Sequence, residues 1–279
     1  MNILYCGDRN TERGILLSLL SIIKHTAAPL EVHLITATVP TEKKTHVPIS
    51  NAFVYRLEEV LREANPQSAA FLHDATTLFR AQPPLANMAT HFTPCCMLRL
   101  YADLVTNVPD KILYLDYDVV ANAPIDALWE TDVSNVEFAG VLDYYGSWFF
   151  RKDIRRADYM NSGVLLLNMA RIRQTGLFAK CRERCALVRM FMPDQSALNK
   201  LADRKMELPR RFNEQRELQS DTVLQHFSTS FRLFPVVHIV SVKPWQQERM
   251  HRILKLHAYD DVLEAYSRLG RTFEFSSEN

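Results

Sequence analysis

Residues 111–120 read K-I-L-Y-L-D-Y-D-V-V, an apolar run followed at once by two acids. The run from Ile112 to Leu115 is typical of a strand that is buried on both faces of a parallel sheet. Asp116 and Asp118 are two residues apart, so continued strand geometry would direct both carboxylates to the same side. Because adjacent carboxylates repel each other, the pair needs a cation. The stretch therefore predicts a divalent-metal site for a nucleotide diphosphate at the carboxyl end of a strand, where open α/β sheets hold their ligands. The alternative is two solvated acids at a strand–loop junction.

The composition is that of an ordinary globular protein. The 279 residues are 47% hydrophobic and 23% charged, and the net charge of +1 gives no indication of nucleic-acid binding. Five cysteines without a C-x-x-C pair favour a reducing compartment. A strand-like run begins at Asn2 with no basic segment before it, so we expect no signal peptide and a cytoplasmic location, including the periphery of a membrane.

The N-terminal part alternates strands with a helix. Residues 2–6 and 31–36 have strand character, and residues 12–25 carry apolar side chains at helical spacing. This order predicts an α/β protein with a mainly parallel central sheet, right-handed crossovers and helices on both faces. Further strands are expected at residues 69–72, 136–142, 164–167 and 236–240, and further helices at residues 49–64, 93–105, 124–129 and 170–189.

Several polar residues fall at expected strand ends or between apolar neighbours. Asp8 follows the first strand, where it either binds a ligand or forms a turn. Arg99, among apolar residues, either snorkels to the surface or points at an anion or sugar. Residues 144–159, Y-Y-G-S-W-F-F-R-K-D-I-R-R-A-D-Y, predict a flap that faces an acceptor or a membrane, or else a packed loop with a solvated charged tip.

The missing motifs argue against a dinucleotide dehydrogenase, a P-loop kinase and an α/β-hydrolase. The seven glycines form neither G-x-G-x-x-G nor a P-loop, and no G-x-S-x-G is present. Asp116, Asp118 and His238 could complete a site of oxygen and imidazole ligands, which suits Mn²⁺, with Mg²⁺ as a substitute through waters. Asp118 has no basic neighbour in sequence, so we expect the metal to balance its charge. His238 would otherwise be an ordinary core histidine, although Lys243 close behind it favours a phosphate-facing loop.

The motifs together resemble those of family 8 retaining glycosyltransferases, the group that contains glycogenin and the bacterial lipopolysaccharide galactosyl- and glucosyltransferases. The resemblance covers roughly residues 1–245 and rests on the order and spacing of six elements. These elements are Arg99-Leu100, K-I-L-Y-L-D-Y-D at 111–118, N-S-G-V-L-L-L-N at 161–168, D-Q-S at 194–196, R-F-N at 211–213 and H-I-V-S-V-K-P-W at 238–245. The last element is one residue shorter than the family pattern and lacks its glycine.

The resemblance implies a GT-A fold, with a catalytic domain at residues 1–248 and a C-terminal helical tail at 249–279. It also implies a Mn²⁺-dependent UDP-sugar donor, glucose or galactose, and transfer with retention of configuration to a glycan, lipid-linked saccharide or protein acceptor. By position, Asp116, Asp118 and His238 would bind the metal, and Lys243 would hold the diphosphate. Lipopolysaccharide synthesis is the bacterial context that the resemblance suggests.

The resemblance also assigns the nucleotide and sugar contacts. Asp8 and Asn10 would contact the uridine and ribose, and Gln195 would lie near the anomeric carbon, where departure and attack on the same face is a common proposal. The residues expected around the transferred sugar are Arg99, Asp143, Asn161, Asp194 and Gln195. Two alternatives remain. One is a non-catalytic sugar-nucleotide-binding protein. The other is a haloacid-dehalogenase-like phosphatase, a class that also has D-x-D after an apolar strand but needs a later G-D-x-x-x-D motif, which this chain lacks.

Overall fold

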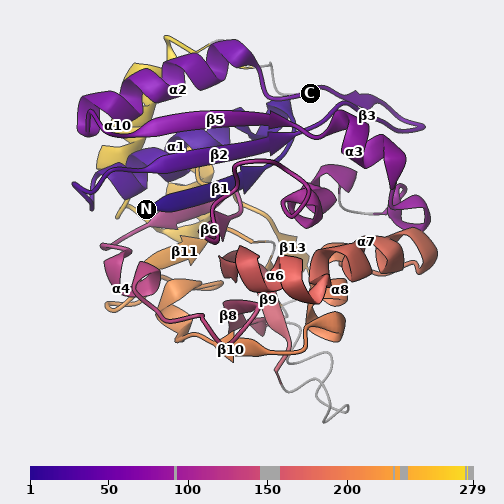
Figure 1. Ribbon diagram of the computed structural model, residues 1–279. Coiled ribbons are helices and arrows are strands. Elements are labelled where there is room, and N and C mark those ends of the chain that lie inside the picture. The colour runs from indigo at the N-terminus through magenta and orange to yellow at the C-terminus, as the bar shows by residue number, and fades with distance from the viewer. Residues whose placement is uncertain (91–92, 145–157, 229, 233–237, 274, 276–279) are drawn as a thin grey trace.

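The computed structural model describes residues 1–90, 93–144, 158–228, 230–232, 238–273 and 275, so most of the predicted flap at 144–159 lies outside the described residues. One seven-stranded sheet crosses this part of the molecule (Figure 1). In spatial order its strands are β10 (Lys205–Glu207), β8 (Phe138–Leu142), β9 (Met160–Asn168), β6 (Lys111–Leu115), β1 (Asn2–Cys6), β2 (Glu31–Thr36) and β5 (Ala69–Asp74).

The sheet is parallel except around β9. This strand runs antiparallel to both of its neighbours, β6 and β8, whereas the other four pairs of neighbouring strands are parallel. Its register places Val164 opposite Leu115, so the start of β9 lies beside the carboxyl end of β6. The predicted mainly parallel sheet is confirmed, and β9 brings residues 161–163 next to the acidic pair.

Helices cover both faces of the sheet, as expected. The α-helices of the described residues are α1 (Glu12–Ile23), α2 (Asn51–Ala64), α3 (Thr76–Ala81), α4 (Asp126–Trp129), α6 (Met169–Thr175), α7 (Leu177–Leu187), α8 (Pro193–Leu201), α9 (Gln247–Arg249) and α10 (Asp260–Gly270). Along β1, Ile3 and Tyr5 join an apolar cluster with α1, α2 and α10, while Leu4 and Cys6 join a second cluster with α6, α7, α8 and the 3₁₀ helix η3 (Pro94–Tyr101).

Two predicted helices differ from the structure. Residues 170–189 form α6 and α7 rather than one helix, because Gly176 adopts a left-handed φ of 67° between them. Residues 93–105 contain the 3₁₀ helix η3 (Pro94–Tyr101) followed by turns. In η3 the Arg99 side chain donates to the carbonyl of Cys96 at 3.0 Å, a bond that competes with the α-helical ladder for that oxygen.

Short elements complete the chain. They are β3 (Val39–Pro40), β4 (Thr45–His46), β7 (Val119–Ala121), β11 (Leu224–His226), β12 (Ser230–Arg232), β13 (His238–Val240), the 3₁₀ helices η1 (Arg9–Thr11), η2 (Leu85–Asn87) and η5 (Arg210–Phe212), and the π-helical turn η6 (Met250–Leu254).

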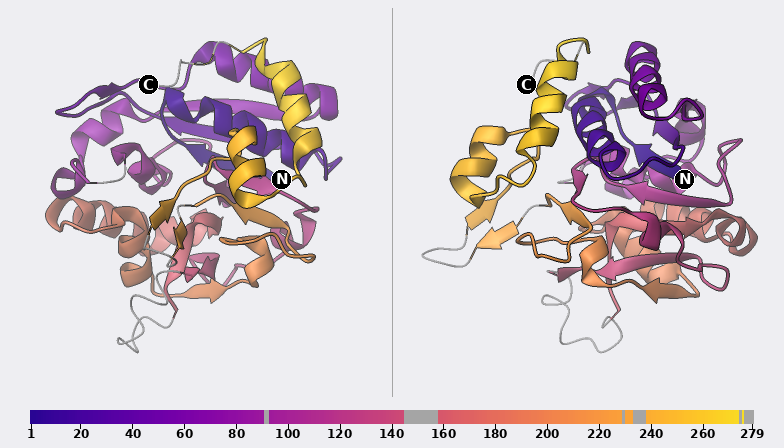
Figure 2. Two further views of the ribbon diagram at one scale, coloured as in Figure 1. Left: turned by 180° about the vertical axis from the view of Figure 1, so that it is seen from behind. Right: turned by 90° about the vertical axis from the view of Figure 1, so that its left-hand side faces the viewer.

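The C-terminal segment packs on the N-terminal half of the protein. Helix α10 runs beside α1 on the back of the molecule (Figure 2). Lys24 pairs with Asp261 at 2.6 Å, and the ring of Phe273 lies 5.5 Å from that of Phe53. The tail predicted at 249–279 therefore buries part of its apolar face here. Among the described residues, no helix has both the length and the apolar character that crossing a bilayer requires.

Candidate active site

A short antiparallel pairing brings a histidine to the acidic pair. Strand β7, which directly follows Asp118, pairs with β11, and the register sets His226 opposite Val119. His226 Nε2 then lies 3.3 Å from Asp118 Oδ1 and 3.7 Å from Asp116 Oδ2. The ring is buried, and its Nδ1 has no hydrogen-bond partner among the residues that the structure describes. The three side chains offer two carboxylate oxygens and one imidazole nitrogen at one point.

Gly163 makes room for this ring. A Cβ on Gly163 would lie 2.2 Å from His226 Cε1 and 3.0 Å from Asp116 Oδ2. Real Cβ atoms do not approach that closely, so a side chain here would displace the imidazole. The glycine in the N-S-G-V-L-L-L-N stretch thus serves a close approach rather than a turn.

Lys243 neutralises Asp118. Its Nζ lies 2.5 Å from Asp118 Oδ2 and 3.3 Å from the carbonyl of Phe227. Asp118 has no basic neighbour in sequence, but the chain folds back and supplies Lys243 from 125 positions away, so a side chain as well as the expected metal can balance its charge. Burial alone raises the pKa of Asp118, but Lys243 and His226 outweigh it and lower that pKa below its usual value. Asp118 is therefore ionised over the whole physiological range.

The pKa of His226 is shifted in the opposite direction to that of Asp118. Burial of the ring favours the neutral imidazole, but the carboxylates of Asp118 and Asp116 outweigh that effect, so the pKa of His226 is raised. Asp118 and the charged form of His226 thus stabilise each other, while Lys243 stabilises the ionised Asp118 and opposes the charge on His226.

Arg99 links the acidic pair to the start of α8. Its guanidinium lies 2.9 Å from Asp116 Oδ1 and 3.1 Å from Asp194 Oδ2, and it donates at 2.5 Å to the carbonyl of Ser162. Only 3% of Arg99 is exposed, so the snorkelling alternative is wrong. Asp116 Oδ1 also accepts from the Tyr114 hydroxyl at 2.6 Å. With the carboxylates of Asp116 and Asp194 and the carbonyls of Ser162 and Cys96 around it, Arg99 orients the site's acids.

Asp194 lies in the first turn of α8 with an elevated pKa. Its burial raises the pKa, Asp116 adds to this effect, and Arg99 opposes it. The carboxyl is 5% exposed. Cys96 Sγ lies 3.7 Å from Asp194 Oδ1, so Cys96, three residues before Arg99, contributes to the wall of the site.

A network of amides joins β8, β9 and α8. Asn161 Nδ2 and Gln195 Nε2 both donate to Asp143 Oδ2, at 2.9 and 3.0 Å. Gln195 Oε1 accepts from the backbone N–H of Ser162 at 2.9 Å, and Asn161 Oδ1 accepts from Gly163 N–H and from Asn213 Nδ2, both at 2.9 Å. Four residues predicted to surround the sugar, Asp143, Asn161, Asp194 and Gln195, are thus buried neighbours of one another.

Asp8 and Asn10 lie at the carboxyl end of β1. Asp8 Oδ1 accepts from the Asn10 N–H at 3.1 Å, and Oδ2 accepts from Asn10 Nδ2 at 3.0 Å and lies 2.5 Å from His46 Nδ1. Asp8 caps the 3₁₀ turn η1, so it does form a turn. Its carboxylate is 5% exposed and is fixed by these contacts.

The cluster around Asp118 fits a divalent metal. The ligand atoms of Asp116, Asp118 and His226 all lie within 4.8 Å of one another, and carboxylate oxygens with one imidazole suit Mn²⁺. His238, the histidine expected from sequence, lies in β13, and the orientation of its ring falls outside what the structure describes.

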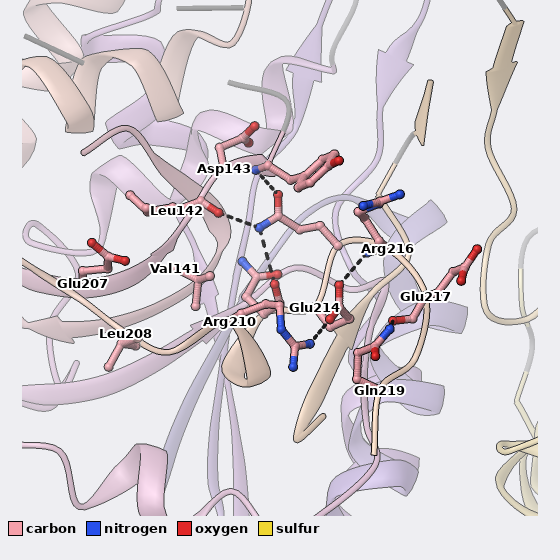
Figure 3. Close-up of a pocket in the computed structure, with 13 residues that line it drawn as sticks. Val141, Leu142, Asp143, Glu207, Leu208, Arg210, Glu214, Arg216, Glu217 and Gln219 are labelled. Carbon is pink, nitrogen blue, oxygen red and sulfur yellow. Dashed lines mark hydrogen bonds and ion pairs between the residues drawn. The ribbon is translucent and has the colours of Figure 1, made fainter. Parts of the chain in front are cut away.

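A cavity of about 440 Å³ borders the amide network rather than the acidic pair (Figure 3). Asp143 and Asn213, which belong to the amide network, line the cavity. Glu207, Glu214 and Arg210 also line it. Gln215 Nε2 donates to the Leu142 carbonyl at 2.9 Å, and Arg210 pairs with Glu214. Arg216 stacks over Tyr144, with its guanidinium carbon 4.5 Å from the ring centroid. The cavity therefore offers several charged and amide side chains and one aromatic face, beside apolar residues such as Val141 and Leu208.

Two members of the site were not found from sequence. His226 sits in L-Q-H-F, a short stretch with no motif of its own, and only the β7–β11 pairing reveals it. Gln215 lies two residues after Asn213 of the R-F-N stretch, so its closeness to Asn213 in sequence was the available signal.

The profile of glycosyl transferase family 8 matches residues 2–249. Among curated proteins, a putative glycosyltransferase of Haemophilus influenzae is 25% identical over 190 residues, which is 64% of this chain and 52% of that protein. Glucoside xylosyltransferase 1 of Homo sapiens is 27% identical over 184 residues, 61% of this chain and 37% of that protein. The chain spans about half, or less, of the length of these relatives.

Solved structures match over nearly the whole chain. The galactosyltransferase LgtC, crystallised with donor and acceptor sugar analogues, gives a TM-score of 0.63 at 19% identity and covers 100% of this chain and 98% of its own. The bifunctional glycosyltransferase WbbM gives a TM-score of 0.69 at 16% identity, over 97% of this chain and 50% of its own. At these identities the likeness shows the fold, which is the predicted GT-A type.

Proposed function

The chain belongs to glycosyl transferase family 8, since that profile matches residues 2–249, and from this premise we propose that it transfers a hexose, glucose or galactose, from a UDP-sugar to a saccharide acceptor. Transfer proceeds with retention of the anomeric configuration and depends on Mn²⁺. The observation that carries the proposal is the convergence of Asp116, Asp118 and His226 beside the buried Asp143–Asn161–Gln195 network. Membership of this family sets aside the phosphatase alternative.

The charged residues hold the diphosphate. Asp116, Asp118 and His226 would ligate the metal, with His238 as the further ligand expected from the sequence motif. The bound metal would supply positive charge against the developing negative charge of the departing nucleotide. Lys243 now balances Asp118, and its flexible ammonium can turn to the phosphate oxygens when the donor enters. Two cationic groups would then face the leaving group.

The ends of β1 and β4 hold the nucleoside. Asp8 is fixed by His46 and by the backbone and side chain of Asn10. A carboxylate held in this way is oriented before the ligand arrives, and it can accept hydrogen bonds from uracil or ribose at little entropic cost. We assign Asp8 and Asn10 to the uridine and its ribose.

The amide network holds the transferred sugar. Asp143, Asn161 and Gln195 present carboxylate and amide groups that can hydrogen-bond to sugar hydroxyls. The ion pair of Arg99 and Asp194 would lie between these groups and the metal site. Gln195 is tied at both ends, to Ser162 N–H and to Asp143. We assign it to the anomeric carbon, where a rigid amide oxygen can stabilise positive charge during departure and attack on one face.

The cavity beside this network would take the acceptor. It reaches Asp143 and Asn213, so an acceptor hydroxyl placed there lies near the sugar end of the site. Tyr144 offers a ring face for a pyranose, and the flanking carboxylates and guanidiniums offer hydrogen bonds. A glycan, a lipid-linked saccharide or a glycosylated protein could each supply such a hydroxyl.

Thermal-shift titration with UDP, GDP and ADP in the presence of Mn²⁺ tests the donor class. We expect the largest rise in melting temperature with UDP, and a smaller rise once EDTA is added. A larger rise with GDP or ADP would contradict the assignment to uridine. UDP release from UDP-glucose and UDP-galactose, with an anomeric assignment of the product by NMR, then separates an enzyme from a non-catalytic binder and tests retention.

A further inference from the structure

The most exposed large apolar side chains of the described residues gather at one edge of the molecule. Leu187, Leu85 and Phe191 are 73%, 70% and 69% exposed, and Val188 beside them is 38% exposed. Leu187 ends α7, Val188 and Phe191 follow it, and Leu85 begins η2, which packs against α7. We call these four residues the apolar ridge. Monomeric proteins seldom leave such side chains grouped in water without a use.

A buried asparagine fixes the ridge in place. Asn87, which is 0% exposed, donates from Nδ2 to the carbonyls of Cys185 and Val188 at 2.6 and 2.7 Å. Its Oδ1 accepts from Met190 N–H at 2.8 Å. One side chain thus ties η2 to the end of α7 and to the loop beyond it. The hydrogen bonds of Asn87 therefore fix the backbone that carries the ridge, so the exposure of the ridge does not come from a frayed end of α7.

The charges around the ridge indicate what covers it. Lys180, Arg184 and Leu187 follow helical spacing on one face of α7, and Arg189 is exposed beside Leu187. Glu183 is the one acid in residues 177–192. Two copies of the chain that met through this edge would bring like charges together. An anionic lipid surface instead accepts both the cations and the apolar side chains.

The ridge also leads directly into the site. Phe191 precedes Asp194 by three residues, so their Cα atoms are at most about 11 Å apart. Met192, between them, places its sulfur 3.3 Å from Gln195 Nε2. A bilayer that covers the ridge therefore lies close to the residues assigned to the transferred sugar.

We propose that the apolar ridge docks the protein on an anionic bilayer, so that an acceptor anchored in that bilayer reaches the site. The docking surface is independent of the chemistry, whereas the choice of a lipid-linked acceptor rests on the proposed function. Figure 1 shows α7 at the edge of the molecule opposite α2, where Tyr55 is 65% exposed. Tyr55 therefore serves as a matched exposed side chain away from the ridge.

Flotation with phosphatidylcholine vesicles, with and without phosphatidylglycerol, tests the proposal. We expect binding to the anionic vesicles that weakens with added salt, and a drop of at least about tenfold in the partition coefficient for the Leu187→Asp/Phe191→Asp double variant. Tyr55→Asp should bind like the wild type. Arg184→Glu/Arg189→Glu should reduce binding to anionic vesicles and leave the weak binding to neutral vesicles unchanged.

UDP release in Mn²⁺, measured without vesicles, keeps the two proposals apart. The ridge variants should release UDP at the wild-type rate, because none of the four ridge residues is a member of the charged cluster or of the amide network. Wild-type protein that releases UDP but fails to float with anionic vesicles overturns the docking proposal alone. A dimer in sedimentation that Leu187→Asp dissociates would also overturn it, since a second copy would then cover the ridge.

Discussion

The candidate site has a charged half and an amide half, which the chain assembles in different ways. Asp116, Asp118, His226 and Lys243 come from distant segments and balance one another's charge. In the amide half, Asn161 and Gln195 use both ends of their side chains in hydrogen bonds within a single network. If the charged half takes the metal and diphosphate as proposed, it must therefore exchange partners when they bind, whereas the amide half is already in place.

This difference indicates how each half contributes. Ion pairs that break and re-form on binding affect the affinity for metal and diphosphate, together with the stabilisation of the leaving group. A fixed network of amides can favour the transition state without reorganising. Substitutions in the charged half should therefore change metal dependence, and substitutions in the amide half should change turnover at saturating donor.

Asp118→Asn should have the largest effect. The change keeps the shape of the side chain and removes the charge that both Lys243 and His226 face. Losing one electrostatic group of this kind costs on the order of 3 kcal/mol, about a hundredfold in rate, and a metal ligand should match or exceed that. The measurement is kcat/KM for UDP release against Mn²⁺ concentration.

Asp103→Asn is the matched control, because the side chain of Asp103 is only 9% exposed and pairs with Arg182 outside the site. It should lower thermal stability and leave the Mn²⁺ dependence unchanged. Equal losses of kcat/KM in the two variants would mean that Asp118 acts only through stability.

Gln195→Ala should have the next largest effect, on turnover. The residue links Ser162 to Asp143, and its loss should lower kcat by about tenfold to a hundredfold with little change in UDP affinity. Asn199 on the same helix provides the comparison, since its side chain binds the N–H and carbonyl of Met160 but does not reach Asp143. Asn199→Ala should cost stability and little kcat. A Gln195→Ala variant with weaker UDP binding and normal kcat would reverse the roles of the two halves.

The smallest predicted effect concerns a histidine pair away from both halves. His33 Nδ1 lies 3.0 Å from His73 Nε2. Burial, and then the neighbouring His73, lower the pKa of His33 to about 4. The unfolded chain binds this proton near pH 6.5 and the folded chain does not, so stability present above pH 6.5 is lost as the pH falls toward 4.

His33→Phe removes that linkage and keeps a ring to stack on Phe71, which lies 5.0 Å away. The loss in unfolding free energy between about pH 7 and about pH 5 should be smaller in the variant than in the wild type, by on the order of 1 kcal/mol. Urea unfolding at the two pH values measures this. The same loss in both proteins would show that His33 titrates normally.

Sequence could predict most of the amide half and only part of the charged half. Asp143, Asn161, Asp194 and Gln195 each follow or begin an element with a clear apolar pattern, and the resemblance to the family's motifs assigned them to the transferred sugar. His226 and Lys243 depend on where long connections return. No local pattern encodes the register of β7 against β11, which is why the partner of Asp118 was missed.

The fold shows the same division. The bounds predicted for β1 and β2 are those in the structure, because continuous apolar runs end at polar residues there. The antiparallel direction of β9 and the break at Gly176 depend on pairing and on one residue's φ angle. Both features depend on tertiary structure, which the periodicity of apolar residues does not predict.

The central claim is that Asp116, Asp118 and His226 form a metal site. Electron paramagnetic resonance of free Mn²⁺, titrated with protein in the presence of UDP, measures the metal affinity directly and needs no turnover. We predict that His226→Ala weakens Mn²⁺ binding by at least about tenfold, and the same titration of His238→Ala decides whether that ring is a further ligand. Unchanged Mn²⁺ affinity in His226→Ala would contradict the claim and would leave His226 as a buried partner of Asp118 alone.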